Sequence, residues 1–138
     1  MPARFVRADG LYQDTGYAYA AIAPPGSLVF AAGACPIDET GQVVGGSDYV
    51  LQARQAMANL VKALAEAGVG LGDVLKTTIY VASADAADLG AVWDVVHADF
   101  AEYEPPSTLL GVSVLGYIGQ LVEIEAVALA GQRQVAGS

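Results

Sequence analysis

The strictest alternation of hydrophobic and polar positions lies near the end of the chain, in residues 121–129, LVEIEAVAL. Successive side chains of a β-strand point to opposite faces, so this pattern predicts a strand with two different faces. The wholly apolar face comprises Val122, Ile124, Ala126 and Ala128. The other face is apolar at its ends but carries Glu123 and Glu125 in its middle. A buried unpaired charge is costly, so these carboxylates need partners or a function.

Several other segments have the composition of strands. Residues 74–81 and 107–115 are dense in β-branched and aliphatic side chains, and the glycines of Gly116–Gly119 predict a turn after the second segment. Shorter strands are predicted around Phe5 and Val6, over Tyr17–Ala23 and over Leu28–Ala32.

Two segments repeat their apolar residues at helical spacing. The first predicted helix begins after Ser47 as N-cap, with Asp48 at the positive end of the helix dipole, and Gly68 follows its last turn. Its apolar stripe comprises Val50, Ala53, Met57, Leu60, Val61 and Leu64. The second helix has Ser83 and Asp85 as candidate caps. Its stripe comprises Leu89, Val92, Trp93, Val96 and Phe100.

The order of these elements predicts one α+β domain over residues 1–138, with a sheet and two helices on one of its faces. The other sheet face then keeps Leu121, Val127 and Leu129 uncovered, which predicts an interface. Composition supports the same conclusion. Hydrophobic residues make up 54% of the chain and charged residues 15%, against about 25% charged residues in typical domains. We therefore expect a surface buried against further copies of the chain.

The charge pattern argues against nucleic acid as a partner. The formal net charge is −9, whereas binding to a phosphate backbone needs clustered basic side chains. The basic residues are scattered and comprise Arg4, Arg7, Arg54, Lys62, Lys76 and Arg133. No apolar run reaches the ~18 residues of a membrane span, and the first residues lack the apolar core of a signal peptide. With a single cysteine as well, the sequence predicts a cytoplasmic protein without a membrane partner.

Few residues carry recognisable chemistry. Glu123 is a candidate for binding water or a ligand in a cleft, or for pairing with Lys76 or with a backbone donor of a neighbouring subunit. Cys35 is either a reactive thiol or an inert one, and its small apolar neighbours favour the inert thiol. His97 has no second histidine or cysteine partner in the pattern, which favours a boundary residue over a base or a metal ligand. We therefore expect no metal and no cofactor.

Two stretches carry a resemblance to a known family. They are QARQAMANLVKALAEAGVGLGDVLKTTIYV at 52–81 and PPSTLLGVSVLGYIGQLVEIEAVA from residue 105 onward, and together they resemble the RidA family, also called YjgF. The similarity extends from about Gly16 to Leu129. It implies a chorismate-mutase-like α+β fold with a mixed sheet, and a homotrimer whose sheets form a central barrel with ligand clefts between subunits. The best-known branch hydrolyses reactive enamines and imines without a cofactor.

The resemblance also assigns candidate site residues, one position at a time. Glu123 corresponds to the family glutamate that positions water and is the candidate catalytic residue. Ser107 stands where the active branch has an arginine that holds the substrate carboxylate, so the chain resembles a branch that lacks the catalytic arginine. The candidate cleft residues are Tyr17, Tyr19, Ala32, Cys35, Trp93, Ser107 and Tyr117. Several of these positions are less polar than in the family pattern.

Three functions follow from this comparison of positions. The first is a homotrimer that binds a small apolar or aromatic molecule, or performs an uncharacterised reaction, in its clefts. The alternative is an enamine or imine deaminase, a hydrolase, although the hydroxyl of Ser107 cannot replace a bidentate charge-assisted grip. The third is an endoribonuclease, which the acidity disfavours. Both a binding protein and an enzyme are consistent with the sequence.

Overall fold

The computed structural model describes residues 3–131 and contains a mixed four-stranded sheet in the order β3-β6-β4-β5. Its strands are β3 (Ser27–Phe30), β6 (Val122–Ala130), β4 (Val74–Val81) and β5 (Ser107–Gly111). β6 is antiparallel to both β3 and β4, whereas β5 is parallel to β4. The remaining elements are β1 (Arg4–Val6), β2 (Ala20–Ile22), α1 (Tyr49–Glu66), the short 3₁₀ helix η1 (Leu71–Asp73) and α2 (Ala86–Phe100). β1 and β2 form a separate antiparallel pair.

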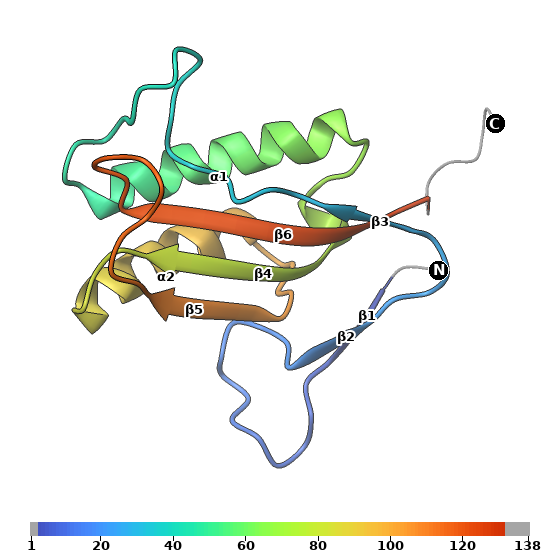
Figure 1. Cartoon of the computed structure of the whole chain (residues 1–138). Helices are drawn as coiled ribbons and strands as arrows, with labels where there is room; N and C mark the ends of the chain where they lie inside the picture. Colours follow the sequence, from blue (N-terminus) through green and yellow to red (C-terminus); the bar gives the residue numbers. More distant parts are fainter. Residues whose placement is uncertain (1–2, 132–138) are drawn as a thin grey trace.

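Both long helices pack behind one face of the sheet (Figure 1). The core lies between them and the inward faces of β4 and β6, and its fully buried side chains include Met57, Leu60, Ile79, Val92 and Ile124. The wholly apolar face of β6 points into this core, as its alternation predicts. The predicted α+β fold, with two helices on one face of a mixed sheet, is therefore confirmed.

The strand predicted over 107–115 is shorter than expected, and it does not pair with β6. β5 ends at Gly111 rather than at residue 115, and the segment to β6 spans residues 112–121 instead of a turn at 116–119. Gly111 lies so close to the Ser83 carbonyl that a Cβ atom there would be 2.7 Å from its oxygen, and the Val112 N–H still donates to the Val81 carbonyl at 2.8 Å. The crossover through α2 makes β5 parallel to β4. β5 lies on the side of β4 that faces away from β6.

The first residue of α1 and its apolar stripe each differ from the prediction at one position. Asp48, not Ser47, is the N-cap of α1, and its carboxylate accepts hydrogen bonds from the backbone N–H groups of Val50 and Leu51. The negative charge of Asp48 also suits the positive end of the helix dipole. Val61, predicted in the apolar stripe, is 42% exposed. Asp85 caps α2, and Gly68 has a φ of +84° just beyond α1, both as predicted.

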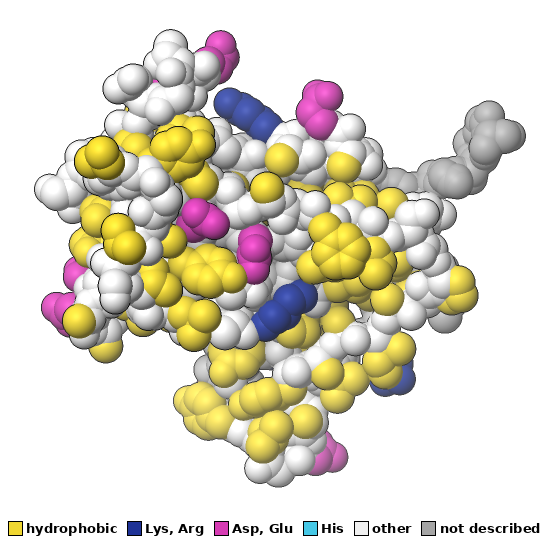
Figure 2. All heavy atoms as spheres, in the orientation of Figure 1, with side chains coloured by type: hydrophobic (Ala, Val, Ile, Leu, Met, Phe, Trp, Pro, Cys, Tyr) yellow, Lys and Arg dark blue, Asp and Glu magenta, His cyan; other side chains and the backbone are white. Residues whose placement is uncertain are grey.

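The sheet face opposite the helices is uncovered within the described chain and is called the open face below. Strand alternation places on it Leu28, Phe30, Lys76, Thr78, Tyr80, Thr108, Leu110, Glu123, Glu125 and Val127. Acidic and basic side chains lie near its middle, with hydrophobic ones around them (Figure 2). Phe30 is 72% exposed there. Leu129 corrects the prediction because it is only 3% exposed, beside its cross-strand partner Leu28.

Two further strand predictions were too long at the N-terminal end of the chain. The strand predicted over 17–23 is reduced to β2, because the backbone N–H of Ala18 donates to the Glu104 carbonyl instead of joining a ladder. The strand predicted over 28–32 ends at Phe30, although Ala34 still forms an isolated bridge with Ile124. This bridge holds the segment after β3 against the edge of β6.

Candidate functional site

Glu123 lies on the open face of β6, opposite Tyr80 of β4. Its Oε1 atom accepts hydrogen bonds from Gln120 Nε2 at 3.1 Å and from the thiol of Cys35 at 3.4 Å. Among residues 3–131, no donor lies within hydrogen-bond distance of Oε2. One carboxylate oxygen is therefore held by the protein, and the other is able to accept a hydrogen bond from water or from an N–H group of a ligand.

Gly33 provides the room for the second oxygen. A Cβ atom at residue 33 would lie 2.1 Å from Oε2 of Glu123 and 2.7 Å from its Cγ, so a larger residue would displace the glutamate. Backbone hydrogen bonds between Ala34 and Ile124, at 2.7 and 3.1 Å, fix this approach. Ala32, a predicted cleft residue, is exposed next to this contact.

Gln120 is a site residue that the sequence analysis missed. Its side chain is buried, donates to the Val122 carbonyl at 3.0 Å and to Glu123, and accepts from the Tyr117 backbone N–H at 3.1 Å. The amide therefore positions the glutamate relative to the exposed loop of Tyr117, itself a predicted cleft residue. Nothing in the local pattern marks Gln120, because it precedes the alternating run.

A second buried amide, Gln52, anchors the same loop to the start of α1. Its Nε2 donates to the carbonyls of Gly46 and Gly119, at 2.8 and 3.0 Å, and its Oε1 accepts from the Leu121 N–H at 2.7 Å. Here the sequence did contain a signal. A glutamine beside Ala53 and Ala56 on the buried side of a helix needs polar partners, because a buried amide without them is costly.

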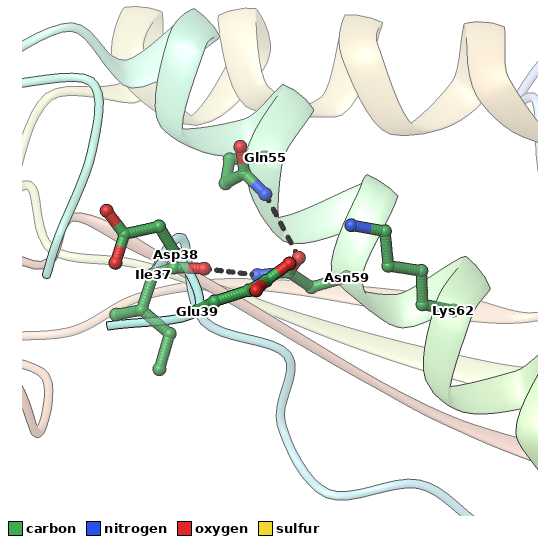
Figure 3. A pocket seen from close by; sticks show the side chains of 6 residues that line it. All are labelled: Ile37, Asp38, Glu39, Gln55, Asn59 and Lys62. Atoms are coloured by element: carbon green, nitrogen blue, oxygen red, sulfur yellow. Dashed lines mark hydrogen bonds between the residues drawn. The ribbon is translucent and has the colours of Figure 1, made fainter. Parts of the chain in front are cut away.

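Cys35 is held beside the glutamate from the other side of the segment. Asn59 of α1 donates from Nδ2 to the carbonyls of Cys35 and Ile37, both at 2.8 Å, and accepts from Gln55. Ile37, Gln55 and Asn59 are among the residues that line an open groove of about 510 Å³ between α1 and residues 37–39 (Figure 3). Asn59 therefore fixes the backbone of the segment that carries Cys35.

The environment of Cys35 disfavours the thiolate form. Burial, followed by the negative charge of Glu123, raises the pKa of Cys35 to about 11. The thiol therefore stays protonated at neutral pH, as the inert alternative in the sequence analysis predicted. The unfolded chain would lose this proton near pH 9, so the thiol lowers folding stability as the pH rises from about 9 to about 11.

We expect iodoacetamide at pH 8 to alkylate Cys35 roughly tenfold to a hundredfold more slowly than a free cysteine peptide, because only the thiolate reacts. Glu123→Gln should speed the reaction by removing the neighbouring charge. Mass spectrometry measures both rates at one position, since the chain has one cysteine. A wild-type rate equal to that of the free peptide would contradict the neutral thiol.

The other acid of the strand has its own partner. Glu125 accepts from the Tyr80 hydroxyl at 2.7 Å, and this hydrogen bond is the main reason why the pKa of Tyr80 is raised. Lys76, an alternative partner predicted for Glu123, instead donates to the Thr108 hydroxyl. Neither Tyr80 nor Lys76 therefore neutralises Glu123.

Aromatic residues gather at a second place, on α2 and the segment before β2. Tyr17 meets Tyr19 and Trp93 edge-on, with ring centroids 5.7 and 6.0 Å apart. Trp93 stacks on His97, with centroids 5.5 Å apart and planes 7° apart. Three of the predicted cleft residues thus form one cluster, and His97 belongs to it.

Charges in this aromatic cluster are paired. Glu104 accepts from Arg7 with one oxygen and lies 2.9 Å from His97 Nε2 with the other. The hydrogen bond to His97, ahead of those from Arg7, lowers the pKa of Glu104. Arg7 also donates to the Tyr17 carbonyl at 2.6 Å, so it ties the segment before β2 to the chain after α2.

Ser107 lies at the start of β5 and faces the helices. It pairs with the buried Thr77, whose hydroxyl donates to Ser107 Oγ at 2.6 Å, and it donates in turn to the Pro105 carbonyl at 3.0 Å. Glu123 projects from the opposite face of the sheet. The structure therefore does not bring these two candidate residues together within one chain.

The candidate residues thus fall into two groups. The glutamate group comprises Gly33, Cys35, Tyr117, Gln120 and Glu123. The aromatic group comprises Arg7, Tyr17, Tyr19, Trp93, His97 and Glu104, with Ser107 three residues further along the chain. Within residues 3–131, no hydrogen bond or ring contact joins the two groups.

The described part of the chain contains no group of three or more His, Cys, Asp and Glu side chains that could hold a metal ion. Over the same residues, neither long helix has the length and hydropathy needed to cross a bilayer.

The fold and site define a small α+β protein with a carboxylate, held by an amide and a thiol, on the open face of its sheet. The chain belongs to the RidA (YjgF) family, since residues 11–130 match the family described as Endoribonuclease L-PSP. A RutC family protein of Pyrococcus abyssi is 38% identical over 104 residues, which cover 75% of this chain and 79% of that protein.

Two further relatives extend the comparison. The 2-iminobutanoate/2-iminopropanoate deaminase of Salmonella typhimurium is 36% identical over 110 residues, which cover 78% of this chain and 82% of the enzyme. The crystal structure of YyfB from Yersinia pestis, a protein of unknown function in the conserved Rid family, superposes with a TM-score of 0.88 at 29% identity. That match covers 94% of this chain and all of YyfB.

Proposed function

We propose that this protein is a cytoplasmic homotrimer that binds a small molecule in clefts between its subunits, with Glu123 as the group that receives the ligand. The observation that carries the proposal is the glutamate itself, with one oxygen held by Gln120 and Cys35 and the other free above Gly33. A fixed carboxylate with a free oxygen is arranged to accept a hydrogen bond from a bound partner.

The uncovered surface supports assembly. Phe30 and Leu28 are largely exposed on the open face, and a second copy would bury them. The division of the candidate residues into two groups supports assembly too. The aromatic group of one subunit, placed against the glutamate group of the next, would complete one cleft. The cleft would then have an acceptor on one wall and aromatic rings on the other.

The second candidate is hydrolysis of imines, which the name of the Salmonella relative suggests. Glu123 would take a proton from water as the water oxygen attacks the imine carbon, and would return it to nitrogen as the carbon–nitrogen bond breaks. This step needs a carboxylate with a free oxygen, which Glu123 has. It does not need a cofactor.

Ribonuclease activity, which the family description suggests, has less support. In the described residues the basic side chains lie apart, and Arg7 is neutralised by Glu104. Such a surface offers little attraction to an RNA backbone.

Native mass spectrometry of freshly purified protein tests the proposal. We expect trimers carrying a small-molecule adduct, and we expect Gly33→Ala to lose the adduct, because the new methyl group displaces Glu123. Gly70→Ala is the matched control, since a Cβ atom there meets nothing within 4 Å. A monomeric wild-type protein without any adduct would overturn the proposal.

A further inference from the structure

The charge on the glutamate group is not compensated by its neighbours. Both donors to Glu123 are neutral, since Gln120 is an amide and Cys35 remains a protonated thiol. Lys76, which shares the open face, pairs with Val127 in the register, whereas Glu123 pairs with Tyr80. That separation along β4 is four residues, or roughly 13 Å. The glutamate group therefore has a negative charge available to a ligand.

The guanidinium and the imidazole of the aromatic group both contact Glu104. This guanidinium, on Arg7, is paired with Glu104 and also donates to the Tyr17 carbonyl. Ser107 has no donor to spare either, because its hydroxyl hydrogen is directed to the Pro105 carbonyl. A ligand carboxylate would meet no unpaired cation here, and it would face Glu123.

The same surroundings favour a cation. Tyrosine and tryptophan rings attract an ammonium or iminium group through their negative faces, and Tyr17, Tyr19 and Trp93 lie together. A carboxylate opposite such rings adds a charge-assisted acceptor for N–H groups. Charge repulsion against anions and attraction for cations act in the same direction, which is how a site discriminates between similar ligands.

We infer that the cleft takes an amine or imine that carries a positive charge and an apolar or aromatic substituent but no carboxylate. The inference rests on the proposed cleft and specifies its ligand. If the cleft also hydrolyses imines, the reaction is R₂C=NH₂⁺ + H₂O → R₂C=O + NH₄⁺. Water supplies the carbonyl oxygen, and nitrogen leaves with the protons.

Two ligands with the same skeleton test the inference. Phenethylamine and L-phenylalanine differ only in the carboxylate, and titration calorimetry measures both with the wild-type protein. We expect phenethylamine to bind at least tenfold more tightly. Glu123→Gln should weaken phenethylamine binding at least tenfold, whereas Glu66→Gln, a charge removal at the exposed end of α1, should leave it unchanged.

A third variant examines the aromatic wall. Glu104→Gln keeps an acceptor for Arg7 but removes the neutralising charge, so the preference for phenethylamine should shrink by several-fold. Circular dichroism checks that each variant is folded. An unchanged preference in a folded Glu104→Gln protein would contradict the claim that Arg7, when paired with Glu104, is not available to a ligand carboxylate.

The outcomes test the ligand class and the proposed cleft separately. Tighter binding of L-phenylalanine would leave the cleft in place but overturn the ligand class. Failure of both compounds to bind at millimolar concentration, with an adduct still present in native mass spectra, would also overturn the ligand class alone. Failure of both without any adduct would overturn the proposed cleft as well.

Discussion

Phe30→Asp is expected to convert the proposed trimer into monomers at micromolar concentration. Phe30 is 72% exposed in the single chain and lies opposite Val127 on the open face. The substitution therefore has little effect on the folding stability of the isolated subunit. In an assembly that covers this face it would remove roughly 1.5–3 kcal/mol of apolar burial per subunit and place a charge in a dry interface.

Sedimentation velocity compares this variant with Leu51→Asp. Leu51 is also half exposed, but it lies in the first turn of α1 on the other side of the molecule, where an acid suits the helix dipole. Leu51→Asp should sediment like the wild type. A Phe30→Asp protein with the same sedimentation coefficient as both would show that the open face is not the subunit interface.

Most of the fold could be predicted from local patterns. The alternation in residues 121–129 predicted the buried face of β6, because a period of two decides which side chains share a face. The errors occur where distant segments meet. β5 ends at Gly111, where the chain lies against the Ser83 carbonyl, and the sequence near Gly111 contains no sign of that contact.

The site was harder to predict than the fold. Glu123 could be found because an acid stands out in an apolar strand. Gly33, Cys35 and Gln120 could not be assigned to it, since the first two are about 90 residues away in sequence and meet it only through the bridge between Ala34 and Ile124. For Ser107, the resemblance identified the missing arginine. Only the structure shows that its hydroxyl is turned toward Thr77 and occupied there.

The second large effect concerns small imino acids. We expect the wild-type protein to hydrolyse 2-iminobutanoate, generated in situ, about 10- to 100-fold more slowly than the Salmonella deaminase. A lost charge-assisted contact is worth roughly 1.5–3 kcal/mol, and each ~1.4 kcal/mol is a factor of ten. Release of the keto acid, followed with a coupled dehydrogenase, measures the difference.

Two variants locate the cause of the slow reaction. Glu123→Ala should remove any residual turnover, because water then has no carboxylate to accept its proton. Ser107→Arg should raise turnover only in part, because residue 107 starts beside Thr77 on the helix side and the guanidinium must turn away from it. The same arginine placed in Glu123→Ala should restore nothing. Wild-type turnover equal to that of the Salmonella enzyme, with sensitivity to Glu123→Ala, would mean that another subunit's cation holds the carboxylate in this cleft.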